Sequence, residues 1–178
     1  MPTMPTLVLD PLPAELEELI ERRRRWGADR HDEIWEGVYH MVPAVGMPHS
    51  NIAYQLTRLL DAAVRAAGLQ ASLEFNLGEG IDDFRIPDLG VHRKLGTGTW
   101  IPTAAIVVEI LSPNDEAWQK LQFYAEHHVD ELLYVDPAEQ SVTWMALRDG
   151  EYEGVERSGL IDLSAAELAE RIDWPPTA

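Results

Sequence analysis

The sequence contains no cysteine and no apolar run long enough to cross a membrane. The lack of cysteine excludes a disulfide scaffold, a thiolate zinc site and a cysteine nucleophile. A membrane-spanning helix needs about 20 predominantly apolar residues in succession, which this chain does not supply. The first 13 residues also lack the basic and apolar segments of a signal peptide. These absences favour a cytoplasmic protein with no membrane partner.

Basic residues are scarce. The chain has 14 Lys and Arg residues against 31 Asp and Glu residues, a formal net charge of −17, and its lysines are Lys94 and Lys120 alone. This balance argues against a protein that coats nucleic acid through bulk charge, but it leaves room for a nucleic-acid enzyme with a local basic groove. It also suits a divalent cation in the site.

Several catalytic motifs are missing as well. The sequence has no phosphate-binding P-loop, no G-x-G-x-x-G and no H-E-x-x-H. Ser112 has no histidine or acid at a recognisable triad spacing, so a serine hydrolase is poorly supported.

The most apolar run in the chain lies at residues 103–113, just after Pro102 and ending in Pro113. Its β-branched residues predict a strand that is buried on both faces. Glu109 interrupts this run. A buried carboxylate is costly unless a cation or hydrogen-bond donors meet it, so Glu109 is the first candidate site residue.

The order of the predicted elements indicates one mixed α/β or α+β domain, with a central sheet flanked by helices. We expect an arm and helix at residues 1–29, the domain at 30–172 and a tail at 173–178. Glu36-Gly37 marks a hairpin turn, and Ser164 with Glu167 forms a capping box. The predicted helices are 11–26, 48–67, 114–128 and one ending near 172, and the predicted strands are 33–42 (a hairpin), 70–76, 84–92, 106–111, 131–136, 141–147 and 151–157.

Asp88 follows Pro87 in a strand-like segment, and a loop of about ten residues joins that segment to the strand of Glu109. The two acids are therefore expected to be neighbours. Adjacent carboxylates repel unless a cation lies between them, and Mg²⁺ or Mn²⁺ is the usual cation where the ligands are oxygens. The alternative is that Asp88 caps a turn while Glu109 forms a salt bridge with a lysine.

Lys120 lies on the helix that follows this strand, and its long side chain can reach back toward the strand's end. A lysine beside metal-bound carboxylates can position a water and stabilise charge on a phosphoryl centre. The alternative is an i,i+4 pair with Glu116. We expect Trp118, Leu121 and Ala125 to form the buried face of this helix.

These residues resemble those of the family of putative restriction endonucleases, which is similar to the PD-(D/E)XK nuclease superfamily. The matching segments are Ile86–Val91 (IPDLGV), Ala105–Pro113 (AIVVEILSP), Lys120-x3-Tyr124-Ala125 and Val129–Pro137 (VDELLYVDP). The resemblance covers roughly residues 30 to 170, and it implies a restriction-endonuclease-like central mixed sheet.

The resemblance also implies a role for each matched residue. Asp88 matches the aspartate of the P-D motif, and Glu109 matches the second metal-binding acid. The usual pattern has lysine two residues after that acid, where this chain has Leu111, so the lysine is displaced to Lys120. Further positions that face the site are matched by Glu36 and His49.

The implied activity is that of a metal-dependent DNA endonuclease, working as a homodimer on phosphodiester bonds. Asp88, Glu109 and the carbonyl of Ile110 are expected to hold Mg²⁺, with Mn²⁺ as a substitute. Arg85, Arg93 and Lys94 flank Asp88 in the sequence and are candidate phosphate contacts. Two alternatives stay open: a non-catalytic dimeric or nucleic-acid-binding module on the same fold, and a metal-dependent phosphoesterase for small molecules.

Overall fold

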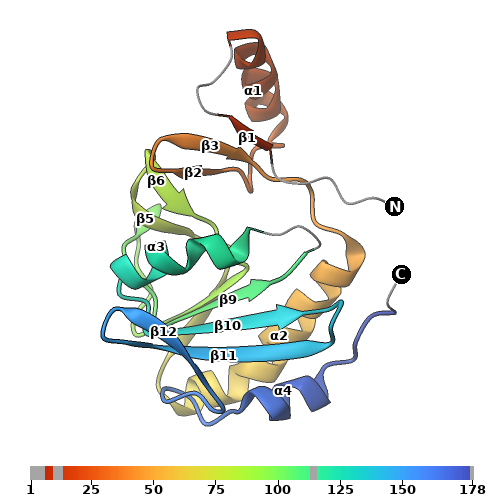
Figure 1. The fold of residues 1–178 in the computed structure, drawn as a ribbon, viewed down its shortest axis with the longest axis vertical. Helices are drawn as coiled ribbons and strands as arrows, with labels where there is room; N and C mark the ends of the chain where they lie inside the picture. The colour runs from red at the N-terminus through yellow and green to blue at the C-terminus, as the bar shows by residue number, and fades with distance from the viewer. Residues whose placement is uncertain (1–6, 10–13, 113–115, 177–178) are drawn as a thin grey trace.

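The computed structural model describes residues 7–9, 14–112 and 116–176 (Figure 1). Residues 11–13 and 113–115, where two predicted helices begin, lie outside the described residues. The helices are α1 (Ala14–Trp26), α2 (Met47–Ala66), the 3₁₀ helix η1 (Ala117–Lys120), α3 (Leu121–Glu126) and α4 (Ala165–Arg171). The strands are β1 (Leu7–Leu9), β2 (Glu33–Trp35), β3 (Val38–Met41), β4 (Gln70–Leu73), β5 (Asn76–Gly80), β6 (Asp83–Arg85), β7 (Leu89–His92), β8 (Trp100–Ile101), β9 (Ile106–Ile110), β10 (Glu131–Asp136), β11 (Ser141–Arg148) and β12 (Glu151–Val155).

The described strands form two mixed sheets. Sheet A has the order β1-β3-β2-β6-β5-β8, and sheet B has the order β12-β11-β10-β9-β7-β4. Strands β9 and β10 are parallel, and so are β5 and β8, while the other pairs are antiparallel. The predicted class, a mixed α+β fold with a buried central strand, is confirmed: all five residues of β9 are buried.

The alternation of side chains along β9 and β10 divides the core into two layers. Ile106, Val108 and Ile110 face one layer, where α2 contributes an apolar stripe of Ile52, Leu56, Leu60 and Val64. Val107 faces the other layer, together with Phe123 and Tyr124 of α3. Glu109 lies two residues after Val107, and therefore points to the α3 face of sheet B.

The segment from 70 to 92 is where the predicted strands differ from the structure. The predicted strand 70–76 is two strands, because the chain leaves sheet B after β4 and enters sheet A with β5. The predicted strand 84–92 divides in the same way around Pro87, into β6 in sheet A and β7 in sheet B. Gly78, expected in a turn, lies inside β5 at a bulge, where its φ of +151° and the closeness of the Asp83 carbonyl leave no room for a side chain.

The helix after β9 also differs from the prediction. It begins with the 3₁₀ turn η1, and its buried residues are Ala117, Lys120, Phe123 and Tyr124. Trp118, expected on the buried face, is 47% exposed. The prediction was wrong because a 3₁₀ turn repeats every three residues, which rotates the buried face relative to an α-helix. As a result, Lys120 points into the molecule.

Both ends of the described chain are attached to the domain. Strand β1 pairs with β3, Arg23 of α1 forms a bidentate contact with Asp32, and Gln55 of α2 bonds the backbone of Asp173. The division at residues 29 and 172 stays a prediction. No helix within the described ranges has both the length and the apolar character needed to cross a membrane.

Candidate active site between the two sheets

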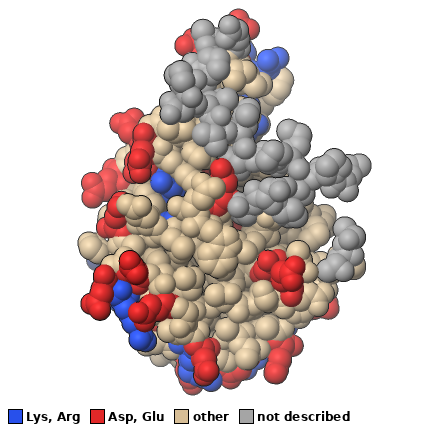
Figure 2. Space-filling model, viewed as in Figure 1, with Lys and Arg blue, Asp and Glu red and all other residues tan. Residues whose placement is uncertain are grey.

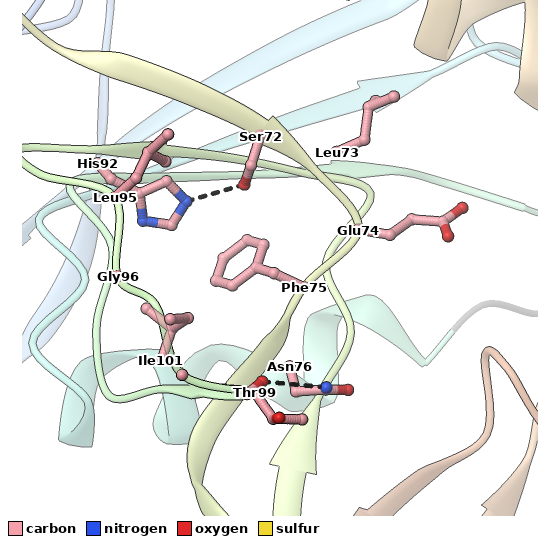
Figure 3. Close-up of a pocket in the computed structure, with 11 residues that line it drawn as sticks. Ser72, Leu73, Glu74, Phe75, Asn76, His92, Leu95, Gly96, Thr99 and Ile101 are labelled. Carbon is pink, nitrogen blue, oxygen red and sulfur yellow. Dashed lines mark hydrogen bonds between the residues drawn. The ribbon is translucent and has the colours of Figure 1, made fainter.

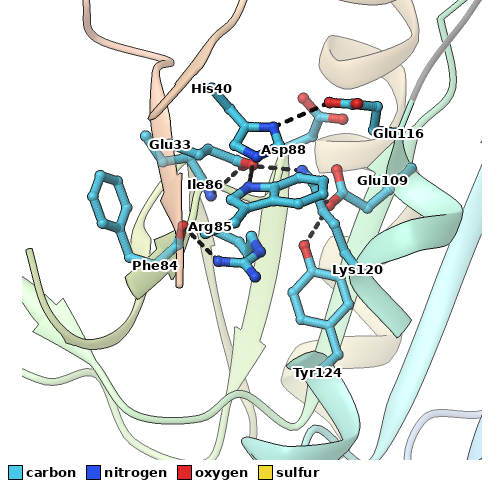
Figure 4. A network of polar contacts seen from close by, with 12 residues as sticks. Glu33, His40, Phe84, Arg85, Ile86, Asp88, Glu109, Glu116, Lys120 and Tyr124 are labelled. Atoms are coloured by element: carbon cyan, nitrogen blue, oxygen red, sulfur yellow. Dashed lines mark hydrogen bonds and ion pairs between the residues drawn. The ribbon is translucent and has the colours of Figure 1, made fainter. Parts of the chain in front are cut away.

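Asp88 and Glu109 come together where the chain passes from sheet A to sheet B (Figure 4). Asp88 lies just before β7, and its Oδ2 accepts a hydrogen bond of 2.7 Å from the backbone N–H of Ile110 in β9. This bond fixes one oxygen of Asp88 next to the residue that follows Glu109. The expectation that the two acids are neighbours therefore agrees with the structure.

Lys120 joins the same cluster from the other side. Its Nζ lies 3.1 Å from Glu109 Oε1 and 2.9 Å from Glu33 Oε1, and the side chain is only 10% exposed. Lys120 thus reaches back from η1 to β9, as the displaced-lysine reading requires. The alternative reading of Glu109 is also present, because Glu109 does form a salt bridge with a lysine.

Glu33 is a member of the cluster that sequence reasoning missed. It lies in β2 of sheet A and is 3% exposed. Its Oε1 accepts from Lys120 and from the backbone of Ile86 at 2.7 Å, and its Oε2 accepts from Trp35 Nε1 at 2.7 Å. The sequence pattern that could have identified Glu33 is an acid two residues before Trp35, at a strand position that faces the same side as that tryptophan.

Glu36, which the resemblance matched to a position that faces the site, lies outside the buried cluster. It occupies the turn between β2 and β3 with φ of +50°, and it is exposed. Its backbone N–H donates to Asp83 Oδ1 at 3.0 Å. The turn carries Glu36 away from the buried cluster, and the hairpin instead contributes Glu33, three residues earlier.

His49 reaches the cluster from the first turn of α2. Its Nε2 lies 3.2 Å from Asp88 Oδ1, so Asp88 is held between His49 and the backbone of Ile110. A second histidine, His40 of β3, was not singled out from the sequence. It is buried, stacks on Trp35 with ring centroids 3.9 Å apart, and places Nδ1 3.2 Å from Glu116 Oε2.

The electrostatics of the cluster follow from its burial. Burial raises the pKa of Glu109 to about 7, and the charges of Asp88 and Glu33 act in the same direction. Lys120 opposes this rise, and so does the hydroxyl of Tyr124, which donates to Glu109 Oε1. For Lys120, burial lowers the pKa, but the two carboxylates outweigh it and the pKa is raised. Lys120 is therefore a cation that can stabilise negative charge.

The basic residues predicted as phosphate contacts are separated in the structure. Arg93 and Lys94 follow β7, whereas Asp88 precedes it, so the backbone of Arg93 lies about 16 Å from that of Asp88 at ~3.3 Å per residue, and that of Lys94 lies one residue farther along the chain. Arg93 forms an exposed ion pair with Asp130. The extended strand carries these two residues to the end opposite Asp88, and their role as phosphate contacts stays a prediction.

Arg85 lies close to the cluster but is buried. Its NH1 donates to Asp83 and to the carbonyls of Ile34 and Phe84. The guanidinium lies 4.6 Å from the ring of Trp35 and 3.9 Å from that of Phe123. Within the described residues its Nε has no hydrogen-bond partner. Arg85 contacts the ring of Trp35, which itself bonds Glu33, and its role as a phosphate contact stays a prediction.

The donor set fits a hard divalent cation. Among the described residues, no three His, Asp or Glu side chains are grouped as a complete metal site. Mg²⁺ does not require one, since it commonly takes one or two carboxylates and completes its shell with water and phosphate oxygens. Lys120 and Tyr124 both contact Oε1 of Glu109, so neither contact uses Oε2. A cation beside Asp88 and Glu109 would also relieve their mutual repulsion.

A separate hollow lies at the other end of β7, bordered by β4 and the loop before β8 (Figure 3). Its volume is about 330 Å³. In its wall His92 Nε2 lies 3.0 Å from Ser72 Oγ, and burial lowers the pKa of His92. Phe75 packs so tightly over Gly90 that a Cβ there would lie 2.3 Å from the ring. This hollow contains none of the clustered residues and is distinct from the candidate active site.

Comparisons with known proteins identify the family and the fold. The crystal structure of a putative nuclease of the DUF820 family from Anabaena variabilis is similar in fold, with a TM-score of 0.63 and 21% sequence identity over 79% of this chain and 90% of that chain. A search of curated proteins found no match. A family model named Uma2, described as putative restriction endonuclease, matches residues 14–173. This match covers nearly the whole chain and confirms the resemblance seen in the sequence. The chain belongs to the Uma2 family of putative restriction endonucleases.

Proposed function

We propose that the protein is a divalent-metal-dependent endonuclease that hydrolyses phosphodiester bonds of DNA. The family description and the nuclease-like fold support a nuclease. The observation that carries the proposal is the position of Lys120, whose Nζ lies 3.1 Å from Glu109 Oε1 although Leu111 occupies the usual lysine position. Lys120 therefore meets Glu109 from a different element of the fold, which is the position that a displaced catalytic lysine requires.

The mechanism assigns a task to each side chain. Asp88 and Glu109 would hold a divalent cation such as Mg²⁺, which would supply charge neutralisation at the phosphate and a bound water of lowered pKa. The backbone of Ile110 and the imidazole of His49 fix the two oxygens of Asp88. Lys120, kept cationic by Glu33 and Glu109, stabilises the charge that develops on the phosphorus oxygens. The carbonyl of Ile110 as a third metal ligand and the homodimer stay part of this proposal.

Metal binding and cleavage test the proposal separately. Calorimetric titration with Mn²⁺ is expected to give binding to the wild type, and loss of binding in Asp88→Ala and Glu109→Ala. Cleavage of supercoiled plasmid in Mg²⁺ is expected to fall by about 100-fold or more in Lys120→Met, as when a group that stabilises transition-state charge is removed, while Mn²⁺ binding persists.

A matched control is Glu126→Gln, which changes an exposed acid at the end of the helix that carries Tyr124. This variant is expected to bind Mn²⁺ and to cleave like the wild type. Wild-type rates of cleavage in Glu109→Ala would contradict the proposal.

The acidic surface supports a second candidate, a metal-dependent phosphoesterase for a small substrate. Figure 2 shows carboxylates spread over the visible face with few basic side chains among them. A net charge of −17 repels a long polyanion more than it repels a small phosphodiester. Hydrolysis of bis(p-nitrophenyl) phosphate without cleavage of plasmid DNA would favour this candidate. Failure of both substrates in protein that binds Mn²⁺ would favour a non-catalytic module.

A further inference from the structure

Two residues of the β2–β3 hairpin form side-chain hydrogen bonds with the turn that carries Lys120. Glu33 and His40 face each other in the register of β2 and β3, so their side chains lie on the same face of sheet A. Glu33 contacts Lys120, and His40 contacts Glu116. One cross-strand pair thus holds two residues that are four positions apart (Figure 4).

Burial and stacking fix the His40 ring that contacts Glu116. His40 is 5% exposed, and its ring lies nearly parallel to that of Trp35, at an interplanar angle of 18°. The ionised carboxylate of Glu116 only accepts hydrogen bonds, so Nδ1 of His40 is the donor at 3.2 Å. Trp35, on which His40 stacks, also donates a hydrogen bond to Glu33, so the tryptophan connects the His40–Glu116 contact to the Glu33–Lys120 contact.

Glu116 and Lys120 would otherwise be partners for each other. In the 3₁₀ turn η1 the two residues do not lie one above the other as they would in an α-helix, but their side chains end at the same cross-strand pair, and their opposite charges attract one another. In the structure each is paired across to the hairpin instead, and Lys120 is directed to Glu109. Glu116 is also the more exposed of the two, at 20% of its side chain against 10%. A local pair between them would therefore draw Lys120 toward solvent and away from Glu109.

We propose that His40 is a positioning residue for Lys120. His40 binds Glu116 and so keeps this carboxylate away from the lysine, while Glu33 holds the lysine in place. The hairpin of sheet A is then the part that sets the lysine against the acids of sheet B. The consequence for turnover rests on the proposed endonuclease function. The consequence for the position of Lys120 does not, and it can be measured without any substrate.

The chain offers an internal reference for this measurement, because its lysines are Lys94, which is exposed, and Lys120, which is buried. Acetylation with a limiting amine reagent, read by peptide mass spectrometry, gives the ratio of modification at Lys120 to that at Lys94. The test variant is His40→Phe, which keeps a ring over Trp35 but removes the nitrogen that bonds Glu116. The ratio is expected to rise about fivefold, the factor that corresponds to a change of roughly 1 kcal/mol.

The decisive variant is the double substitution His40→Phe with Glu116→Gln. Neutralising Glu116 removes the competitor for Lys120, so the ratio is expected to return to the wild-type value. Glu116→Gln alone is expected to leave the ratio unchanged, and His40→Asn, which places an amide nitrogen near the position of Nδ1, is expected to behave as wild type. The matched control is His31→Phe, since His31 also pairs with a glutamate, Glu74, at 3.9 Å, but outside the cluster.

An unchanged ratio in His40→Phe would overturn the proposal, and so would a raised ratio that Glu116→Gln does not reverse. Plasmid cleavage measured on the same proteins is expected to fall in His40→Phe and to recover in the double variant. If the ratios behave as expected while the wild type cleaves nothing, the positioning role stands and the proposed function fails. If the wild type cleaves but the ratios do not change, the reverse holds.

Discussion

Two buried glutamates on adjacent strands show how the same residue type takes different parts. Glu131 of β10 accepts from Trp144 Nε1 at 2.7 Å, Ser158 Oγ at 2.5 Å and Gly159 N at 2.6 Å. All these donors are neutral, and they tie β10 to β11 and to the loop after β12. Glu109 of β9 instead receives a lysine and a tyrosine and lies beside Asp88. We therefore assign Glu131 to the framework and Glu109 to the site.

At the scale of single residues, the hydroxyl of Tyr124 is the group whose removal should lower the unfolding free energy most clearly. It donates to the carboxylate of Glu109 inside the protein, whereas the hydroxyl of Tyr152 donates to the neutral carbonyl of Val129 at 2.7 Å. Since hydrogen bonds to charged groups are worth about 1.5–3 kcal/mol and neutral ones about 1 kcal/mol, Tyr124→Phe should lose about 2 kcal/mol of unfolding free energy and Tyr152→Phe about half of that.

Urea denaturation about two pH units above the pKa of Glu109, where its carboxyl is ionised, measures both values. Equal losses in Tyr124→Phe and Tyr152→Phe would mean that the Tyr124 hydroxyl does not stabilise a charged Glu109.

At the scale of elements, the turn of the β2–β3 hairpin sets the geometry of the cluster. Glu36 and Gly37 have φ values of +50° and +85°, which matches the twist of a two-residue hairpin loop. The turn pairs Trp35 with Val38, and this register places Glu33 opposite His40. A slip by one residue would turn both side chains away from the site.

Glu36 is the weak position of this turn, because a glutamate adopts positive φ less readily than asparagine. We expect Glu36→Asn to raise the unfolding free energy by about 0.5 kcal/mol, and Gly37→Ala to lower it by about 1 kcal/mol. Thermal and urea unfolding measure both effects. Mn²⁺ titration of Glu36→Asn is expected to match the wild type, and weaker binding would return Glu36 to the site.

The predicted and the observed elements together show which parts of the fold the sequence pattern could predict. Regular patterns predicted α2, β10 and the capping box of Ser164 and Glu167, all of which are present. The segment 70–92 was predicted less well, because apolar alternation does not reveal that a chain changes from one sheet to another. The cluster shows the same limit: Asp88, Glu109 and Lys120 belong to neighbouring segments, but Glu33 and His40 come from the other sheet.

At the scale of the whole molecule, the charge of −17 sets the response to salt. Exposed carboxylates repel one another in the folded state, and salt screens this repulsion. We expect the thermal midpoint to rise by about 3 °C, equivalent to ~1 kcal/mol, between about 0.02 M and about 0.5 M NaCl. Choline chloride should act like NaCl if screening is the cause. A falling midpoint would indicate that attractive ion pairs outweigh the repulsion.

The distance along the chain between Glu33 and Lys120 has a consequence for biosynthesis. The two residues are 87 positions apart, and the ribosome makes Lys120 after Glu33, Asp88 and Glu109. A nascent or prematurely terminated chain that stops before residue 120 carries every acid of the cluster without its cation. Such fragments lack the group that the proposed mechanism assigns to charge stabilisation, so the proposed activity requires synthesis and folding of the chain beyond residue 120.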